Sequence, residues 1–175
     1  MNRKLEIRES RPCDATGIEK LYVDAFPDEN LLPLVRELLN LRQSVLSLVG
    51  IRENVVVGHI SFTFCNVDGG IDKVALLAPL AVDPTLHKQG IGSALVHSGL
   101  KQLENAKIGY VFVLGDPAYY RRFGFKTEDK VATPYPLPIE WREAWQSIKL
   151  RDVEASLDGM LSVPGPWRQN DLWAP

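Results

Sequence analysis

The feature that most constrains the fold of this chain is an apolar run followed by a polar loop, two glycines and an amphipathic helix. Residues 73–82 contain the run Val-Ala-Leu-Leu-Ala-Pro-Leu-Ala-Val, which is typical of a strand buried on both faces. Pro79 has no N–H for a ladder hydrogen bond, so we expect a bulge or a local splay of the sheet there. The helix is expected over residues 89–104, where apolar residues recur on one face.

Apolar periodicity over the rest of the chain indicates a mixed α/β fold, with one sheet flanked by helices. Asp14 is expected to cap a helix that begins near Ala15, and Pro33 to open a second helix. An extended segment is expected from Phe125 onward. The expected strands cover residues 5–7, 44–52, 55–64, 73–82, 109–114 and 144–150, and the expected helices cover residues 15–25, 31–42, 89–104 and 118–122.

Length and charge narrow the class of protein. The 175 residues fit one compact domain over residues 1–175. The formal net charge is −2, so composition does not favour nucleic acid as a partner. The N-terminus is polar, and no apolar run approaches the roughly 20 residues that span a bilayer. We expect a cytoplasmic protein with no membrane partner and, because Cys13 and Cys65 show no metal-ligand spacing, no metal.

The segment after the buried strand has the chemistry of a phosphate-binding helix start. N–H groups in the first helical turn lack intrahelical partners and, with the helix dipole, attract anionic oxygens. The P-loop pattern is absent, and a dinucleotide fingerprint would need a small residue where this chain has Leu95. From the glycines alone, a helix start that binds nothing remains open. The candidate binding residues are His87, Lys88, Gln89, Gly90, Ile91, Gly92 and Ser93.

Two motifs together carry a family resemblance. Residues 87–92 have the form Gln/Arg-x-x-Gly-x-Gly/Ala with His in the first position, and residues 120–125 have the form Tyr-x-x-x-Gly-Phe. In this order they resemble the GNAT superfamily of N-acetyltransferases, and most of all its YhbS-type branch. The resemblance implies a single mixed, mostly antiparallel central sheet that is flanked by helices and splayed between its two central strands.

The resemblance also implies an activity. Acetyl-CoA would be the cosubstrate, and its acetyl group would pass by direct attack to a primary amine of a small molecule, an amino acid or a peptide. Leu80 and Val82 would pair with the pantetheine arm, and residues 87–93 would hold the diphosphate. Tyr120 would be the general acid for the leaving thiolate, since a phenol with a pKa of about 10 is protonated at neutral pH. A packing role for Tyr120, and a non-catalytic acyl-CoA-binding regulatory module, are the alternatives.

The general base and the acceptor stay open at this stage. Glu53, His59, Asp68 and Asp116 are candidate bases by residue type only. A histidine in an apolar strand, such as His59, is more typical of a hydrogen-bonded structural residue, and Asp116 is more typical of a helix cap. The acceptor pocket is expected from the first two helices, the Asp68 loop and the C-terminal region. The tail, which contains Pro and Trp, leaves a homodimer open.

Overall fold

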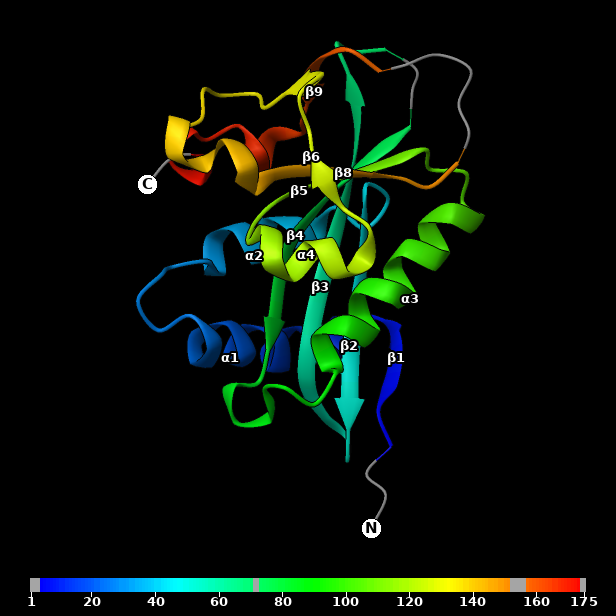
Figure 1. Ribbon diagram of the computed structural model, residues 1–175. Coiled ribbons are helices and arrows are strands. Elements are labelled where there is room, and N and C mark those ends of the chain that lie inside the picture. The colour runs from blue at the N-terminus through cyan, green and yellow to red at the C-terminus, as the bar shows by residue number, and fades with distance from the viewer. Residues whose placement is uncertain (1–3, 71–72, 152–156, 174–175) are drawn as a thin grey trace. The chain divides into compact units, whose positions relative to one another are not determined.

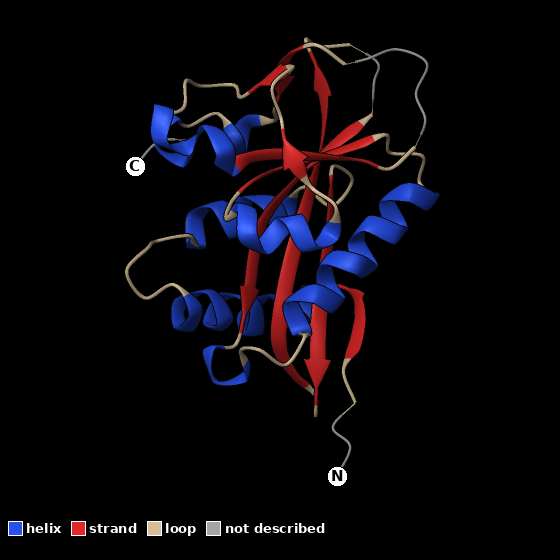
Figure 2. Cartoon of the chain, in the orientation of Figure 1, coloured by secondary structure: helices blue, strands red, loops and turns tan. Residues whose placement is uncertain are grey.

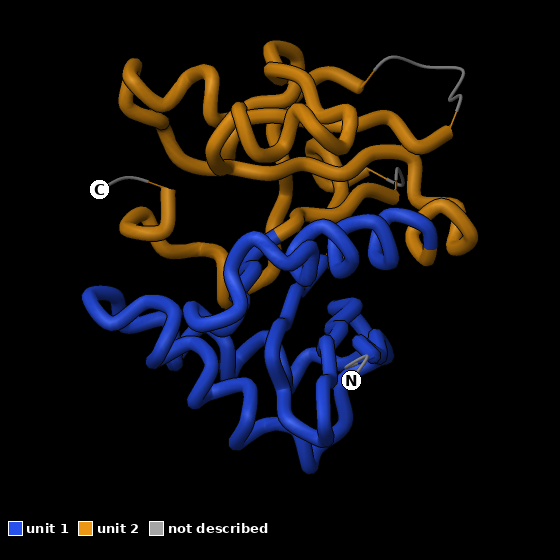
Figure 3. Tube along the Cα trace, turned by 60° about the horizontal axis from the view of Figure 1, so that its bottom comes forward, with its two compact units in different colours: residues 1–62, 78–101 blue, residues 63–77, 102–175 orange. Residues whose placement is uncertain are grey.

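The computed structural model describes residues 4–70, 73–151 and 157–173. The ends of the expected domain, residues 1–3 and 174–175, therefore lie outside the described residues. The chain divides into two compact units, which are residues 1–62 with 78–101 and residues 63–77 with 102–175 (Figure 3).

The structure confirms a mixed α/β chain with a mostly antiparallel sheet flanked by helices (Figures 1 and 2). Strands follow the order β1-β2-β3-β4-β5-β8-β6, with β9 beside β3 and β7. β4 pairs with β5 in parallel, and so does β7 with β9. The elements are β1 (Glu6–Glu9), α1 (Ala15–Ala25), α2 (Leu32–Asn40), β2 (Val45–Arg52), β3 (Val55–Val67), β4 (Val74–Val82), α3 (Ile91–Asn105), β5 (Tyr110–Leu114), α4 (Pro117–Tyr120), β6 (Lys126–Thr127), β7 (Val131–Ala132), β8 (Trp145–Lys149) and β9 (Gly159–Ser162).

In the first unit, helices lie on both faces of the strands. Val49 and Ile51 of β2 pack in a buried cluster with Ile18 and Tyr22 of α1. Gly50 lies between those two residues and points the other way, because side chains alternate along a strand. A Cβ on Gly50 would contact Ile91 of α3 at 3.7 Å. The N-terminal part of α3 therefore covers the face opposite to α1.

The side-chain cap that we expected from Asp14 at the start of α1 is not formed. Asp14 stands directly before α1, but its side chain makes no capping hydrogen bond there. Its carboxylate instead accepts from the Arg8 guanidinium at 2.7 and 3.0 Å and from the Arg11 N–H at 2.7 Å. A charged partner on β1 competes with the helix end for the same oxygens, which the local sequence pattern does not reveal.

The strand that contains Pro79 carries the candidate coenzyme residues Leu80 and Val82. Its parallel pairing with β5 runs from Val74, opposite Tyr110, to Leu76, opposite Phe112. The register therefore ends before Pro79, in agreement with the expected splay. The strand passes this proline through a cis Ala78–Pro79 peptide bond and continues to Val82.

The core of the second unit gathers aromatic rings from distant parts of the sequence. Trp145 stacks on Phe112 with ring centroids 5.5 Å apart, and Trp173 meets Trp145 edge-on at 5.9 Å. The Trp167 indole N–H donates to Thr63 Oγ1 at 3.0 Å. The sequence predicted no regular structure after residue 150. However, β9 pairs with the distal end of β3 and brings this tail onto the sheet.

Candidate coenzyme-binding and catalytic site

The loop that follows β4, residues 83–90, is tied to β3 at its first residue. The Asp83 N–H donates to the Val57 carbonyl at 2.9 Å. The Asp83 carboxylate accepts from the Thr85 N–H at 2.9 Å and the Thr85 hydroxyl at 2.8 Å. Sequence reasoning did not single out Asp83, although Asp followed by Pro and Thr is a helix-start pattern that could have indicated it.

Farther along this loop the backbone turns left-handed twice, at Lys88 (φ 62°) and Gly90 (φ 82°). This conformation is sterically unfavourable for a residue with a Cβ, whereas glycine adopts it freely. A Cβ on Gly90 would find no atom within 4 Å. The space beside the Gly90 backbone is therefore open, and a ligand could approach the main chain there.

The helix that begins next presents unpaired backbone donors. The Ala94 N–H donates to the Gly90 carbonyl at 3.0 Å, so Gly90 is the residue directly before α3. By helix geometry, the N–H groups of Ile91, Gly92 and Ser93 have no acceptor within the helix. Ile91 is buried, so only its amide is suited to a ligand contact. These donors, at the positive end of a 15-residue helix, can bind phosphate oxygens.

A glycine in β3 lets this helix start sit close to the sheet. A Cβ on Gly58 would lie 2.8 Å from Leu95 Cδ1 and 2.9 Å from Ile91 Cγ2. A side chain at Gly58 would therefore lift the helix start or displace two buried side chains. An isolated glycine inside a strand is the signal of such a close approach, and sequence reasoning overlooked it.

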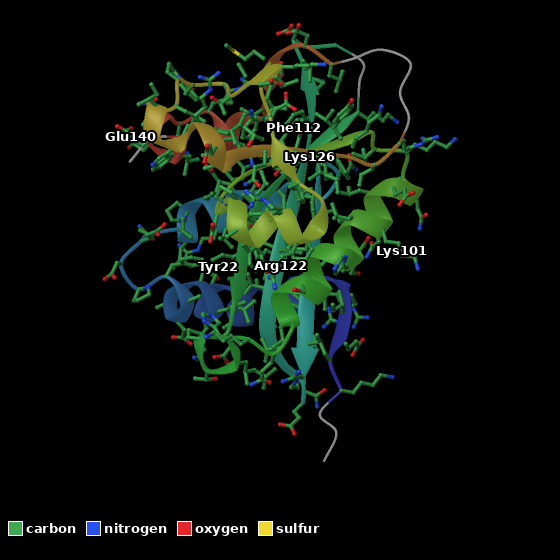
Figure 4. The ribbon with its side chains drawn as sticks, viewed as in Figure 1. Tyr22, Lys101, Phe112, Arg122, Lys126 and Glu140 are labelled. Carbon is green, nitrogen blue, oxygen red and sulfur yellow. The ribbon has the colours of Figure 1, made fainter. Side chains whose placement is uncertain are left out.

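The second unit holds the other candidate segment. Asp116 caps α4, because its Oδ1 accepts from the Ala118 N–H at 2.9 Å. This confirms the interpretation of Asp116 as a helix cap. A short 3-10 turn extends the helix to Phe123, and Gly124 ends it with φ 100°. Arg122 lies on this turn with its guanidinium 4.5 Å from the centroid of the Tyr119 ring (Figure 4).

Tyr120 is fixed by its neighbours within this unit. Its ring meets Tyr119 edge-on at 5.0 Å and Phe125 at 5.7 Å. It also lies over Gly115, where a Cβ would be 2.5 Å from Tyr120 Cε2. Burial raises the pKa of the Tyr120 phenol, and the charges of Tyr119 and Asp116 act in the same direction. The phenol is therefore protonated at neutral pH.

Besides Asp116, two more of the residues named as candidate bases, His59 and Asp68, have structural roles. His59 is fully buried, with Nδ1 2.7 Å from Tyr22 Oη and Nε2 2.8 Å from Ser47 Oγ. Burial lowers the pKa of His59 to about 3, so the ring is neutral at ordinary pH. Asp68 holds β9 through a 2.9 Å hydrogen bond from the Met160 N–H. Glu53 stands in the β2–β3 turn with φ 52°. None of these contacts identifies a general base.

Comparison with known proteins decides the family. The profile of the Acetyltransferase (GNAT) family matches residues 15–125, which is more than half of the chain. The chain belongs to this acetyltransferase family.

Individual relatives agree with this GNAT assignment along most of their length. The chain is 34% identical over 160 residues to the Uncharacterized N-acetyltransferase YjhQ of Escherichia coli K12, covering 87% of this chain and 88% of that protein. The crystal structure of YhbS from Escherichia coli in complex with CoA aligns with a TM-score of 0.87 at 29% identity, over 97% of this chain and 94% of that one. A GNAT acetyltransferase from Brucella melitensis in complex with acetyl-CoA aligns with a TM-score of 0.78 at 28% identity, over 94% and 99% of the two chains.

The GNAT chain places its predicted site residues in two groups. Leu80, Val82 and the run from His87 to Ser93 lie together in the first unit, whereas Tyr120 lies in the second. A further residue, Arg52, contacts the loop through Gln89 and was not predicted.

Cavities of ligand size occur in each unit of this acetyltransferase. In the first unit, the connection between α1 and α2 borders a cavity of about 330 Å³, with Tyr22, Phe26, Asp28 and Glu29 among its lining residues. In the second unit, a cavity of about 570 Å³ is lined by residues 128–139 together with Arg142, Trp145 and Met160. The first cavity carries two carboxylates, whereas the second has charged residues of both signs.

The described residues of this acetyltransferase lack two kinds of structural feature. They contain no group of three or more His, Cys, Asp or Glu side chains arranged to hold a metal ion. No helix among them is long and apolar enough to cross a membrane.

Proposed function

We propose that this protein transfers the acetyl group of acetyl-CoA to a primary amine of a small molecule, an amino acid or a peptide. The observation that carries the proposal is the helix start at Gly90, whose open backbone is followed by the amides of Ile91, Gly92 and Ser93. The crystal structures of two relatives of similar fold contain CoA and acetyl-CoA. These residues fit a diphosphate, because backbone amides can bind its oxygens without side-chain specificity.

The rest of the coenzyme would follow β4. Main-chain groups of Leu80 and Val82 would pair with the amides of the pantetheine arm. The end of the β4–β5 register at Leu76 supports this, because the strand beyond it is not paired to β5 in that register. His87, Lys88 and Gln89 would complete the binding loop, with Lys88 exposed and able to add positive charge.

In the reaction, the amine loses a proton to water so that its neutral nitrogen can bond to the acetyl carbonyl carbon, the carbon–sulfur bond breaks, and the amide nitrogen releases a second proton to water, from which the tyrosine is reprotonated. We propose that Tyr120 donates its phenolic proton to the departing sulfur. This role requires a protonated phenol, and the raised pKa keeps the proton on Tyr120 throughout the neutral range. The packing of Tyr120 over Gly115 supports it too, because a general acid must be held in one place.

We assign the acceptor to the cavity at the connection between α1 and α2. Asp28 and Glu29 line it, and their carboxylates would attract a cationic amine. A double change of Asp28→Asn and Glu29→Gln should raise KM for the amine several-fold and leave KM for acetyl-CoA unchanged. An equal rise in both KM values would contradict the placement of the acceptor in this cavity.

The whole proposal is tested by titrating the protein with CoA in a calorimeter and by following free thiol release from acetyl-CoA with a panel of amines. Saturable binding together with amine-dependent thiol release is expected. Binding without turnover on any amine would favour a non-catalytic acyl-CoA-binding regulatory module. No binding at millimolar CoA would refute the proposal. A single domain over residues 1–175, a cytoplasmic location and a homodimer remain predictions.

A further inference from the structure

Arg52 stands at the end of β2 and reaches the loop that follows β4. Its Nη1 donates to Gln89 Oε1 at 2.9 Å. Gln89 lies between the two left-handed residues of the loop, Lys88 and Gly90. Such conformations persist where surrounding contacts hold them. The Arg52 contact therefore acts next to Lys88, whose left-handed backbone is unfavourable for a residue with a side chain.

The β2–β3 hairpin holds this loop at both ends. At the start of the loop, the Asp83 N–H is bonded to Val57 of β3. At its end, the Gln89 side chain is bonded to Arg52 of β2. Among the side-chain hydrogen bonds described for residues 87–90, the Arg52 contact is the one that connects them to the sheet. This hydrogen bond therefore links the loop just before α3 to β2.

The guanidinium of Arg52 also carries an energetic cost. Its Nε is buried and has no hydrogen-bond partner among the described residues. A buried donor without a partner destabilises the folded state. A side chain that served only to stabilise the hairpin end would not need this donor. The unpaired Nε would be tolerated if the hydrogen bond from Arg52 to Gln89 is needed for function.

We propose that Arg52 is a positioning residue for the coenzyme: it holds Gln89, and through it the loop, so that the first amides of α3 face the diphosphate. This inference rests on the proposed function. It predicts an effect on coenzyme binding, because Arg52 acts on the loop and not on the reacting atoms. KM for acetyl-CoA and Kd for CoA should rise while kcat at saturating acetyl-CoA stays the same.

The test is a double-mutant cycle in the full-length protein, with Arg52→Ala, Gln89→Ala and the double variant. Each single change should raise the Kd of CoA about fivefold, the effect of one hydrogen bond, and the double variant should be no weaker than the worse single one. Arg52→Lys should recover part of the affinity, because an ammonium can donate to Gln89. Arg42→Ala serves as the matched control, since Arg42 is exposed just before the opposite end of β2. Thermal melts establish that each variant is folded.

The outcomes separate this inference from the function on which it rests. Wild-type protein that binds CoA, together with an Arg52→Ala variant that binds equally well, would overturn the role of Arg52 and leave the proposed function intact. Additive losses in the double variant would also overturn it, because Arg52 would then act independently of Gln89. A fall in kcat with unchanged KM would do the same. Wild-type protein that binds no CoA would refute both.

Discussion

Gly58 of β3 lies directly under Leu95 of α3, so closely that a Cβ on the glycine would be 2.8 Å from Leu95 Cδ1. Leu95 is fully buried and cannot turn away into solvent. The distance between this helix and the sheet is therefore limited by the absence of a side chain at Gly58. Because the same helix starts at the proposed diphosphate site, packing and coenzyme binding are linked at this point.

The first prediction concerns Gly58→Ala. The added methyl group should overpack the interface and lower the free energy of unfolding by about 1–3 kcal/mol, as measured by urea denaturation. It should also raise the Kd of CoA, because the helix start moves. Gly165→Ala is the control, since a Cβ there meets no atom within 4 Å. Normal stability of Gly58→Ala would contradict the close packing.

The second prediction distinguishes two effects of a side chain at Gly90, which are the strain in the left-handed backbone and the loss of contact with the coenzyme. Gly90→Ala should cost about 1–2 kcal/mol of stability, because alanine resists the left-handed conformation. Gly69→Ala is closely matched: Gly69 has φ 68°, and its Cβ would also meet nothing within 4 Å. The two variants should lose similar stability, but only Gly90→Ala should weaken CoA binding. Equal CoA affinity in both would argue against the helix start as the diphosphate site.

The third prediction addresses the proposed general acid. Tyr120→Phe removes the proton donor and should lower kcat about 100-fold with little change in KM for acetyl-CoA. Tyr119→Phe is the neighbouring control and should retain most of the activity. Full activity of Tyr120→Phe between pH 6 and about 9 would exclude proton donation by this residue.

Gly115 offers an independent test of the same role. Gly115→Ala would push against the Tyr120 ring at 2.5 Å and should also lower kcat. Combined with Tyr120→Phe, it should cost little more than the tyrosine change alone, because both act on one group. If the two reductions in kcat multiply in the double variant, Gly115 affects activity independently of Tyr120.

The fourth prediction follows from the buried His59. Its folded-state pKa of about 3 lies below the ordinary value of 6.5, so the unfolded chain takes up a proton first as the pH falls. Its contribution to stability is therefore complete above pH 6.5 and is lost toward pH 3, by about 1.4 kcal/mol for each pH unit. Urea unfolding of wild type and His59→Gln at pH 7 and 5 measures the difference. If the two proteins show the same pH dependence, His59 is not buried as a neutral ring.

Strongly patterned elements could be predicted from the sequence, and elements that depend on distant partners could not. The run around Leu76 and the glycines before Leu95 predicted the buried strand and the helix, and the structure contains both elements. The family resemblance needed the motif at residues 120–125 as well. Asp14 was misread as a helix cap because its true partner, Arg8, lies on another element. The strand β9 was missed because its four residues are held by pairing with β3 rather than by a pattern of their own.

The sequence by itself determined the fold class, the order of the main elements, the family, and the presence of a helix start whose first N–H groups have no acceptor within the helix. These depend on periodicity and short motifs, which are local along the chain. Only the tertiary structure decided that Arg52 holds Gln89, that Gly58 seats Leu95 and that His59 is enclosed by Tyr22 and Ser47. Each of these relationships joins residues far apart in sequence, and their partners are chosen by the packing of whole strands and helices, which no local pattern encodes.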